Sequence, residues 1–295
     1  MRIDALCAQK FSDISRSQFS KRGKFFRIEI FEVGRKSVPR PMPKPAKFSV
    51  RFKEKWMVQY EEKMDLTDIH PWKYKLSVLQ ESKTWIAIEK PVGISVHPSQ
   101  SDPSQKTIVN ALLYQFKSLS ESYDTINGQK IPRPGLVHRL DKQTSGVLLV
   151  AKTTKTHMYI QKQWSKATKI YYALVSGVPP KKGKIESGIV RDPKDRQKMK
   201  ALDSQKSKKA ITYFETQETK NNISLVRVQI PTGRTHQIRV HLSSIGFPIV
   251  GDEKYGGIPF KRLMLHATRL SFPDPDKNGA LTEITAPLPK EFLFA

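Results

Sequence analysis

The stretch from His138 to Lys152 is the sequence feature that most constrains the fold, because a polar turn leads there into a strongly apolar run. Val147–Val150 are consecutive aliphatic side chains, a density that predicts a strand covered on both faces. Asp141 precedes this strand, and the Thr144–Gly146 turn lies between them. A carboxylate held by a rigid scaffold suits catalysis, but Asp also accepts ordinary turn hydrogen bonds. The local pattern leaves both interpretations open.

The charge balance points to a polyanionic partner. The 295 residues include 52 Lys or Arg and 27 Asp or Glu, which gives a net charge of +25. Such an imbalance predicts nucleic acid as the partner before a membrane surface, since charge that serves solubility alone is usually mixed in sign. A length of 295 residues suits one large domain and a small module.

Cysteine content and hydropathy narrow the class further. Cys7 is the only cysteine, which excludes an intrachain disulfide and a cysteine-based zinc site. The first ten residues are too polar for a signal peptide. No apolar run approaches the roughly 18 residues of a membrane span. We therefore expect a cytoplasmic protein associated with nucleic acid and not with a membrane.

Periodicity and turn residues predict the order of the elements. Helices are expected within 1–20, at 108–116, at 155–164 and from Ile238 to Ile245; strands are expected at 25–31, 48–52, 84–90, 94–98, 147–150, 171–177, 212–214, 225–230, 265–272 and 284–289. In the last helix, Ile238, Leu242 and Ile245 form one apolar stripe. Thr235 is its predicted N-cap, and Gly246 is predicted to follow its C-cap.

Two tracts carry much of the positive charge. Residues 1–55 hold 15 Lys or Arg against 5 Asp or Glu, and they include a proline-rich stretch at 38–45 that predicts an extended loop. Residues 179–209 form the second basic tract, for which a solvated loop is the alternative interpretation. Residues 56–80 have no assigned structure and are interpreted as a connector.

Several common sites are absent from the sequence. There is no phosphate-binding loop, no Gly-x-Gly-x-x-Gly and no Gly-x-Ser-x-Gly elbow, and the kinase companions of a His-Arg-Asp motif are missing. His236 and His241 have a spacing that superficially resembles metal ligands, but no Glu or Cys completes a set. What remains is one carboxylate, several arginines and a strong positive field.

The opening of the chain resembles the S4 RNA-binding module, a small fold of two helices and a hairpin. The likeness rests on Arg2-Ile-Asp4, Leu6, Ser15–Gln18 and the segment from Ile28 to Lys36. The segment from Ile28 to Gly34 departs from the usual hairpin sequence, and the alternative is a basic, partly ordered extension. With this module at 1–60, we expect a connector at 61–80 and a catalytic domain at 81–295.

The rest of the chain, from about residue 82, resembles the pseudouridine synthases of the RluA type, which modify ribosomal and transfer RNA. The matching blocks are Lys90–Pro98, His138–Gly146, Lys169–Ala173, Gly233–His241 with Gly251–Gly256, Leu265–Ala267 and Ala286–Pro289. His-Arg-Leu-Asp in place of Gly-Arg-Leu-Asp favours this family over its small-subunit-type relatives. The segment Pro273-Asp274-Pro275 departs from the usual His-Pro, which we interpret as a surface change.

The resemblance implies an α+β fold with a bent, mainly antiparallel sheet, flanking helices and a cleft across the sheet. It implies an isomerase that uses neither a metal nor an organic cofactor. Such an enzyme breaks the N1–C1′ bond of a uridine and rejoins the uracil through C5. By the match, Asp141 is the catalytic carboxylate, which attacks C1′ or removes the C2′ proton. Tyr171 packs on the target base and is a candidate for handling a proton. Arg239 pairs with the aspartate, and Arg139 fills the gap left by the flipped nucleotide.

The predicted partner is RNA, held by phosphate contacts that release counterions. The expected RNA-contacting residues are Arg16, His138, Arg139, Thr144, Arg191 and Arg196. The expected substrate is 23S rRNA, because the S4-bearing branch of the family is mainly ribosomal, and the expected state is a monomer. The alternatives are a tRNA-directed synthase of the same type and a catalytically idle RNA-binding or ribosome-assembly protein. An idle protein would have no chemical reason to keep Asp141, Tyr171 and Arg239 together.

Overall fold

The structure is a computed structural model that describes two parts of the chain. The described residues are 26–32, 56–62, 69–98, 105–116, 119, 123–126, 129–132, 134–193, 195, 198–205 and 207–293. The chain divides into one compact unit of residues 1–68 with 99–104 and a second of residues 69–98 with 105–295. Each unit is described by itself.

The first unit contains an antiparallel hairpin of β1 (Phe26–Glu32) and β2 (Trp56–Glu62), paired with Ile28 opposite Tyr60. The predicted strand at 25–31 is confirmed. Its partner β2 lies in a segment for which the sequence predicts no secondary structure. The predicted helices within 1–20, the proline-rich loop at 38–45 and the predicted strand at 48–52 lie outside the described residues. The S4-like module and the domain boundaries therefore stay predictions.

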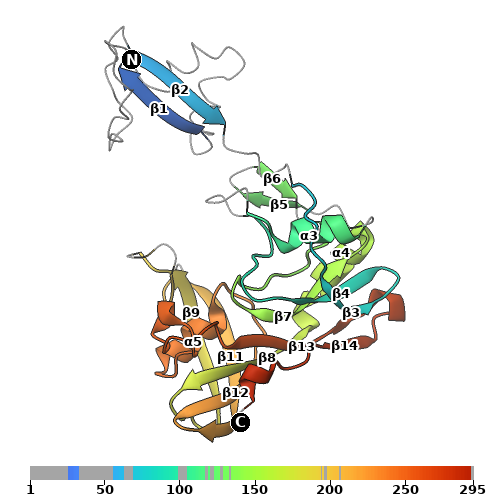
Figure 1. The fold of residues 1–295 in the computed structure, drawn as a ribbon. Helices are drawn as coiled ribbons and strands as arrows, with labels where there is room; N and C mark the ends of the chain where they lie inside the picture. The colour runs from blue at the N-terminus through green and yellow to red at the C-terminus, as the bar shows by residue number, and fades with distance from the viewer. Residues whose placement is uncertain are drawn as a thin grey trace. The chain divides into compact units, whose positions relative to one another are not determined.

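The described residues of the second unit form twelve strands and three helices. Figure 1 shows how these elements are arranged. The strands are β3 (Ser77–Glu81), β4 (Trp85–Lys90), β5 (Tyr123–Ile126), β6 (Gln129–Pro132), β7 (Ser145–Ala151), β8 (Thr168–Ser176), β9 (Lys182–Arg191), β10 (Met199–Ala201), β11 (Lys208–Lys220), β12 (Ile223–Gln229), β13 (Leu265–Pro273) and β14 (Leu281–Thr285); the helices are α3 (Ile108–Gln115), α4 (Thr154–Gln163) and α5 (Gln237–Ser244); and the short 3-10 turns are η1 (Trp164–Lys166), η2 (Glu253–Tyr255), η3 (Pro275–Lys277) and η4 (Lys290–Phe292).

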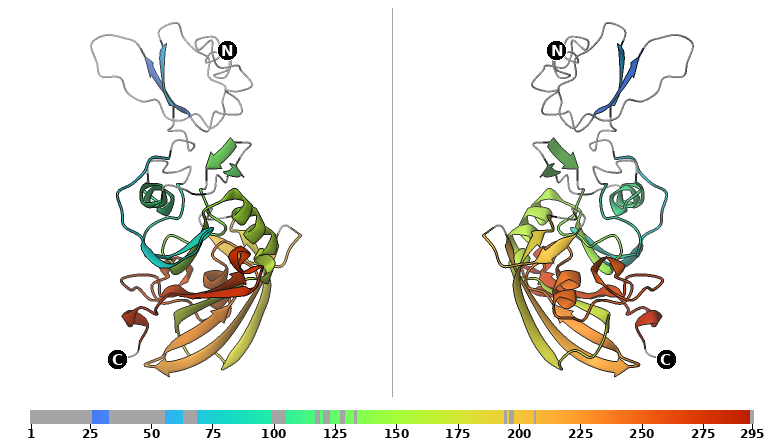
Figure 2. Two further views of the ribbon diagram at one scale, coloured as in Figure 1. Left: turned by 90° about the vertical axis from the view of Figure 1, so that its right-hand side faces the viewer. Right: turned by 90° about the vertical axis from the view of Figure 1, so that its left-hand side faces the viewer.

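One ten-stranded sheet runs through the second unit in the order β10-β9-β11-β12-β8-β13-β7-β4-β3, with β14 paired to β13 beside this path, and β5 and β6 form a separate hairpin. Within the large sheet, β13 pairs with β7 in parallel, and the other pairs are antiparallel. The large sheet curves strongly from one end to the other (Figure 2). The predicted α+β fold with a bent, mainly antiparallel sheet is confirmed.

Strand β13 joins the two halves of this sheet, and a glycine makes the junction close. Its first residues pair with β7, with His266 opposite Ser145 and Ala267 opposite Gly146. Gly146 has a φ of 113°, and a Cβ there would lie 2.2 Å from the carbonyl oxygen of Ala267. A larger residue would therefore separate the strands. The junction lies directly after the turn that carries Asp141.

The apolar run in β7 is buried on both faces, as predicted, and every residue of β7 is buried. Ile86, Ile88, Leu148 and Val150 lie in one hydrophobic cluster, and Trp85, Ala87, Val147, Leu149 and Ala151 lie in another. Successive side chains of a strand point to opposite faces, so β4 and β7 separate the two clusters. Helix α3 contributes to the first cluster and α4 to the second.

The predicted helices at 108–116 and 155–164 are confirmed as α3 and α4, and local side-chain bonds fix where they begin. The backbone N–H of Thr107 donates to Oδ1 of Asn110 at 2.9 Å. In α4, the N-cap Thr153 accepts a hydrogen bond from the N–H of Thr156 at 3.2 Å. These bonds satisfy backbone donors that a helix start leaves unpaired.

The predicted strand at 94–98 is wrong, because these residues have no regular secondary structure apart from a bend at 96–97. Their carbonyls serve a helix instead of a neighbouring strand. The N–H groups of Ile108 and Val109, at the start of α3, donate to the carbonyls of Ser95 and Val96 at 2.9 and 3.0 Å. The first turn of α3 thereby satisfies groups that a strand would have paired.

The solvated-loop interpretation of the basic tract at 179–209 is wrong for its described part, which contains β9, β10 and the start of β11. Ile185 and Ile189 are buried on β9, whose exposed residues are all charged. The predicted strand at 212–214 is the middle of the longer β11, which pairs with β12 and has a bulge between Thr216 and Glu218.

Helix α5 follows the prediction at its end and differs at its start. Gly246 has a φ of 86°, and the N–H groups of Gly246 and Phe247 donate to the carbonyls of Ser243 and Leu242. These bonds form the expected glycine C-terminus. Ile245 ends the helix and is 36% exposed, so the third member of the predicted stripe is wrong.

The N-cap of α5 is His236 and not the predicted Thr235. The side chain of Gln237 turns back onto the preceding loop, and its Oε1 accepts hydrogen bonds from the N–H of Arg234 and the hydroxyl of Thr232. The loop is therefore held by the first helical residue, and no N-cap side chain is needed. Within the described residues, no helix is both long and apolar enough to cross a bilayer.

The interpretation of Pro273-Asp274-Pro275 as a surface change is wrong. Asp274 is fully buried, and its side chain accepts hydrogen bonds from Trp85 Nε1 at 2.8 Å and from the hydroxyl of Thr282 at 2.8 Å. It also accepts one from the N–H of Asp276 at 2.9 Å. This carboxylate joins β4, β14 and η3.

Candidate active site

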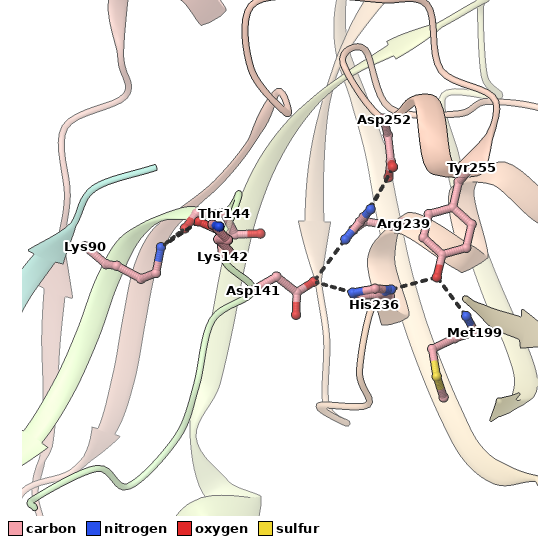
Figure 3. Close-up of polar contacts among 9 residues, drawn as sticks. All are labelled: Lys90, Asp141, Lys142, Thr144, Met199, His236, Arg239, Asp252 and Tyr255. Carbon is pink, nitrogen blue, oxygen red and sulfur yellow. Dashed lines mark hydrogen bonds and ion pairs between the residues drawn. The ribbon is translucent and has the colours of Figure 1, made fainter. Parts of the chain in front are cut away.

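A pocket lies at the junction between the two halves of the sheet. Its lining comes from the turn before β7, from β8, from the end of β12 and the loop after it, from α5 and from β13: Arg139, Leu140, Asp141, Thr144, Tyr171, Ile230, Gly233, Arg234, Thr235, His236, Gln237, Ile238, Arg239 and Leu265. The three predicted catalytic residues, Asp141, Tyr171 and Arg239, therefore lie around one pocket. Figure 3 shows the polar contacts on one side of it.

Asp141 is held loosely by its neighbours. Its side chain is 20% exposed, and Oδ2 lies 3.7 Å from Nη1 of Arg239 and 3.9 Å from Nε2 of His236. Both distances exceed a hydrogen bond. Within the described part of the chain, the two nearest charged or polar partners thus face one oxygen, Oδ2 (Figure 3). Among the described residues, no hydrogen bond or ion pair to the other oxygen, Oδ1, is found.

The backbone around Asp141, in contrast, is held firmly by Lys90. This side chain is fully buried, and Nζ donates to the carbonyls of Pro91 at 2.7 Å, Lys142 at 3.1 Å and Thr144 at 2.8 Å. Burial lowers the pKa of Lys90 to about 7, and the negative charge of Asp141 opposes that shift. The residue at the end of β4 therefore fixes the turn that presents Asp141. Sequence comparison found Lys90 only as part of a matching block.

Arg239 bridges two carboxylates. Its Nε and Nη2 donate to Oδ2 and Oδ1 of Asp252 at 2.7 and 2.8 Å, in a two-bond pair. The predicted pairing with Asp141 is present as the longer contact of 3.7 Å. Burial opposes the charge of Arg239, but the hydrogen bonds and charge of Asp252 and the charge of Asp141 raise its pKa above the ordinary value. Asp252 thus orients a permanent cation toward the catalytic candidate.

Tyr171 supplies a flat apolar wall. It lies on β8 and is 8% exposed. Burial raises the pKa of its phenol, and the nearby negative charge of Asp141 raises it further. Tyr171 therefore stays neutral at physiological pH. With Leu140, Ile230, Ile238 and Leu265 it forms the apolar part of the pocket lining.

His236 is a pocket residue that the sequence analysis considered only as a metal ligand. Its Nδ1 lies 2.7 Å from the hydroxyl of Tyr255, and this hydroxyl accepts a hydrogen bond from the N–H of Met199 at 2.9 Å. His241 has a separate partner, since its Nδ1 lies 2.9 Å from the hydroxyl of Thr212. No group of three metal-ligating side chains is found among the described residues. The signal that could have found Tyr255 and Asp252 is the block Gly251–Gly256, which we matched without assigning roles.

The predicted RNA-contacting residues occupy different environments. Arg139 is exposed and lines the pocket, and Arg191 is exposed at the end of β9. Thr144 lines the pocket but is only 2% exposed. Arg16 and Arg196 lie outside the described residues.

His138 is already used within the protein. Its Nε2 accepts a hydrogen bond from the N–H of Leu149 at 2.9 Å, and its ring stacks on Trp164 with the centroids 4.8 Å apart. Burial lowers the pKa of His138 to about 3, and the charge of Lys169 lowers it further. A neutral imidazole bonded to β7 favours a structural role, and an RNA contact could use only its remaining atoms.

Comparisons with known proteins identify the family. Residues 84–244 match the family model described as RNA pseudouridylate synthase. The chain is 34% identical over 310 residues to ribosomal large subunit pseudouridine synthase D of Haemophilus ducreyi, covering 99% of this chain and 89% of that protein. It is 40% identical over 222 residues to an uncharacterized RNA pseudouridine synthase, YlyB, of Bacillus subtilis. This alignment covers 73% of this chain and 70% of that protein. The chain belongs to the RNA pseudouridylate synthase family.

Solved structures agree with this membership. Human RNA pseudouridylate synthase domain containing 1 superposes with a TM-score of 0.57 at 25% identity, covering 77% of this chain and 86% of that chain. Human RNA pseudouridylate synthase domain containing 4 gives a TM-score of 0.55 at 26% identity, covering 73% and 90%. The protein is therefore an isomerase that converts uridine in RNA to pseudouridine.

Proposed function

We propose that the protein isomerises specific uridines of large-subunit ribosomal RNA and that Asp141 is the carboxylate that begins the reaction. The observation that carries the catalytic assignment is the orientation of Asp141, whose Oδ2 faces Arg239 and His236 while the carboxylate borders the pocket. The ribosomal substrate is supported by relatives that are named ribosomal large subunit pseudouridine synthase D. One of them aligns with 99% of the chain.

The proposed reaction moves one bond and one proton within the substrate. In one route, Oδ1 of Asp141 attacks C1′, the N1–C1′ bond breaks, and its electron pair passes to the uracil ring. The uracil turns within the pocket, C5 bonds to C1′, and the carboxylate leaves. The proton on C5 is then lost, and N1 gains one. In the other route, Asp141 removes the C2′ proton, and a C1′=C2′ double bond forms as the N1–C1′ bond breaks. After the uracil turns, C5 bonds to C1′, Asp141 returns the proton to C2′, and the proton on C5 is lost while N1 gains one.

Two neighbours support either route. Arg239 stabilises the ionised carboxylate at the start and when it is released, since a preorganised cation acts strongly in a partly buried site. Tyr171 offers a neutral aromatic face on which the uracil stacks while it is detached, and such stacking contributes about 1–3 kcal/mol per base. The proposal requires no metal or organic cofactor and needs one copy of the chain.

The substrate nucleotide must leave its stack to enter the pocket. Arg139, exposed beside Asp141, is proposed to fill the space that the flipped nucleotide leaves. Residues 1–60 are proposed to form an S4-like module. Its positive charges, and those of Arg191, Arg196 and other basic groups of 179–209, would bind the phosphates of the RNA backbone. Because the proposed substrate is ribosomal RNA, we propose that the enzyme works in the cytoplasm.

Pseudouridine mapping across cellular RNA tests the proposal directly. Cells lacking the protein should lose pseudouridine at defined positions of 23S rRNA, and the wild-type chain should restore them. The Asp141→Asn variant should not restore them at an equal protein level. Loss of sites in transfer RNA alone would contradict the ribosomal assignment, and restoration by Asp141→Asn would contradict the role of Asp141.

A further inference from the structure

His236 has an unusual backbone conformation that fixes its side chain beside Asp141. Its φ of 55° and ψ of 20° lie in the left-handed region, which few non-glycine residues adopt. Although His236 is the N-cap of α5, its side chain makes no capping hydrogen bond. Instead the ring lies between Tyr255 and Asp141 (Figure 3). The strain of this conformation thus serves the placement of the ring and not the start of the helix.

A chain of donors determines which ring nitrogen of His236 carries the proton. The backbone N–H of Met199 can only donate, so the hydroxyl oxygen of Tyr255 accepts it at 2.9 Å. Burial raises the pKa of Tyr255, which therefore keeps its hydrogen. The atom 2.7 Å away, Nδ1 of His236, is then the natural acceptor. In the neutral ring, the proton is consequently on Nε2.

The opposite tautomer would be unfavourable at both ends of this chain. The hydroxyl hydrogen of Tyr255 would have no other acceptor among the hydrogen bonds of the described residues. At the other end, the lone pair of Nε2 would face Oδ2 of Asp141, 3.9 Å away. The Nε2–H tautomer avoids both costs and directs a donor at the carboxylate.

We propose that His236, as the Nε2–H tautomer set by Tyr255 and the backbone of Met199, is a positioning residue that holds Oδ2 of Asp141 and leaves Oδ1 for the substrate. This inference rests on the proposed role of Asp141 and assigns its orientation to a group besides Arg239. At 3.9 Å the Nε2–H group lies just beyond hydrogen-bond distance, and a shift of the carboxylate by about 1 Å would bring Oδ2 within it, so His236 acts through Asp141. Sequence and family matching had assigned His236 no such task.

The neutral form of His236 is the working form. Desolvation lowers the pKa of His236, Asp141 and Asp252 oppose that shift, and Arg239 and Lys254 add to it. The other group in contact is the neutral Tyr255, and Arg234 also lines the pocket. Protonation would place a second cation against Oδ2, strengthen the ion pair and make the carboxylate a weaker nucleophile or base. Turnover should therefore fall as the pH drops through a midpoint below 6.5.

The experiment compares single-turnover rates of the full-length protein at saturating enzyme across a pH series. His236→Gln supplies an uncharged N–H donor at every pH, whereas His236→Ala supplies none. His236→Ala should lose about tenfold to a hundredfold in rate at neutral pH, the usual effect of one hydrogen bond to a charged group. His236→Gln should recover much of that loss and should lack the acid limb of the wild type. His241→Gln, on the same helix, should keep the acid limb.

The coupling to Tyr255 gives a second readout. Tyr255→Phe should slow the wild-type background but should have little further effect in His236→Gln, because the hydroxyl acts by setting the tautomer. Nitrogen-15 NMR of the imidazole should show the Nε2–H tautomer in the wild type and a loss of that preference in Tyr255→Phe. This measurement does not depend on turnover or on the identity of the RNA.

The outcomes separate this inference from the proposed function. An acid limb that persists unchanged in His236→Gln, or an Nδ1–H tautomer in the wild type, would overturn the role of His236 while leaving Asp141 catalytic. Turnover by Asp141→Asn at the wild-type rate would overturn the proposed role of Asp141 and this inference with it. The expected pattern is an inactive Asp141→Asn, a partly rescued His236→Gln without the acid limb, and the predicted tautomer.

Discussion

The pocket around Asp141 and the corner around Asp274 contain carboxylates on the same sheet, and the two are held in opposite ways. Asp274 is fully buried and accepts three hydrogen bonds of 2.8 to 2.9 Å from Trp85, Thr282 and Asp276. Asp141 is 20% exposed, and its nearest cationic partner lies 3.7 Å away. The first carboxylate is fully occupied by the protein, and the second is kept available.

The difference shows how a fold can hold a carboxylate in place without occupying its oxygens. The protein fixes Asp141 through its backbone, since Lys90 binds the carbonyls of Lys142 and Thr144 and the N–H of Thr144 donates to the carbonyl of Asp141. It fixes Asp274 through the carboxylate itself. Buried polar groups are stable when satisfied, so Asp274 contributes to folding. The carboxylate oxygens of Asp141 make no hydrogen bond among the residues that the structure describes, and we propose that they serve the reaction.

Apart from Asp141→Asn, Arg239→Lys is expected to change the reaction rate most among the variants that test this difference between the two carboxylates. Lysine keeps the charge but cannot form the two-bond pair with Asp252 while facing Asp141, so the cation loses its orientation. We expect the single-turnover rate to fall roughly 10²- to 10³-fold, as for loss of one preorganised electrostatic group. RNA affinity should change little. Asp252→Asn, which leaves Arg239 in place but weakens its anchor, should give a smaller loss; a normal rate in Arg239→Lys would contradict the orienting role.

Asp274→Ala should give the converse result. The substitution leaves the N–H of Trp85 and the hydroxyl of Thr282 buried without an acceptor, which costs about 1–3 kcal/mol each. We expect a loss of about 3 kcal/mol and a melting temperature lower by about 6–12 °C. The rate per folded molecule should stay near that of the wild type, measured well below the melting transition. Asp274→Asn keeps one acceptor and should lie between; a large rate defect in a folded Asp274→Ala would break the comparison.

A smaller effect is expected for His138, which is three residues from Asp141 in the sequence but belongs with the structural groups. Its pKa is about 3 in the folded protein and near 6.5 when unfolded. Between these values the unfolded chain binds the extra proton, so stability is complete above pH 6.5 and falls as the pH drops. The loss reaches at most about 1.4 kcal/mol per pH unit.

Denaturant unfolding at several pH values measures this contribution. The glutamine in the His138→Gln variant can accept the N–H of Leu149 but does not titrate. Below pH 6.5, the slope of unfolding free energy against pH should therefore decrease by up to the value for one proton, about 1.4 kcal/mol per pH unit. A residual slope is expected, because burial also lowers the pKa of His266 to about 4. An unchanged slope in His138→Gln would show that the imidazole is not held neutral.

Sequence patterns predicted the parts of the fold that depend on local composition. The aliphatic run at Val147–Val150 is dense enough to require burial on both faces, and Gly246 ends α5 because its position needs a left-handed residue. In residues 179–209, the many lysines favoured the interpretation as a solvated loop. The strands that bury Ile185 and Ile189 were therefore not predicted. The resemblance to the family predicted Asp141, Tyr171 and Arg239 as site residues, and they line one pocket. Nothing in the local sequence pattern indicated that Tyr171 lies near Asp141.

The groups that sequence reasoning missed depend on contacts between distant segments. Lys90 reaches the carbonyl of Thr144 across 54 residues, and Trp85 donates to Asp274 across 189. A single sequence contains no signal for which buried donor meets which acceptor. Asp274 was therefore interpreted as a surface residue, and Lys90 and His236 received no role.

The central claim is that Asp141 serves chemistry and not stability, and purified Asp141→Asn tests it most directly. Pseudouridine formation, RNA affinity and denaturant unfolding would be measured on the same preparation, beside the wild type and Asp274→Asn. We predict that Asp141→Asn loses at least about 10⁴-fold in rate, as expected for removal of a nucleophile or base. Its unfolding free energy should change by no more than about 0.5 kcal/mol, and RNA binding should remain. Substantial pseudouridine formation by Asp141→Asn, or a loss of activity explained by unfolding, would contradict the account.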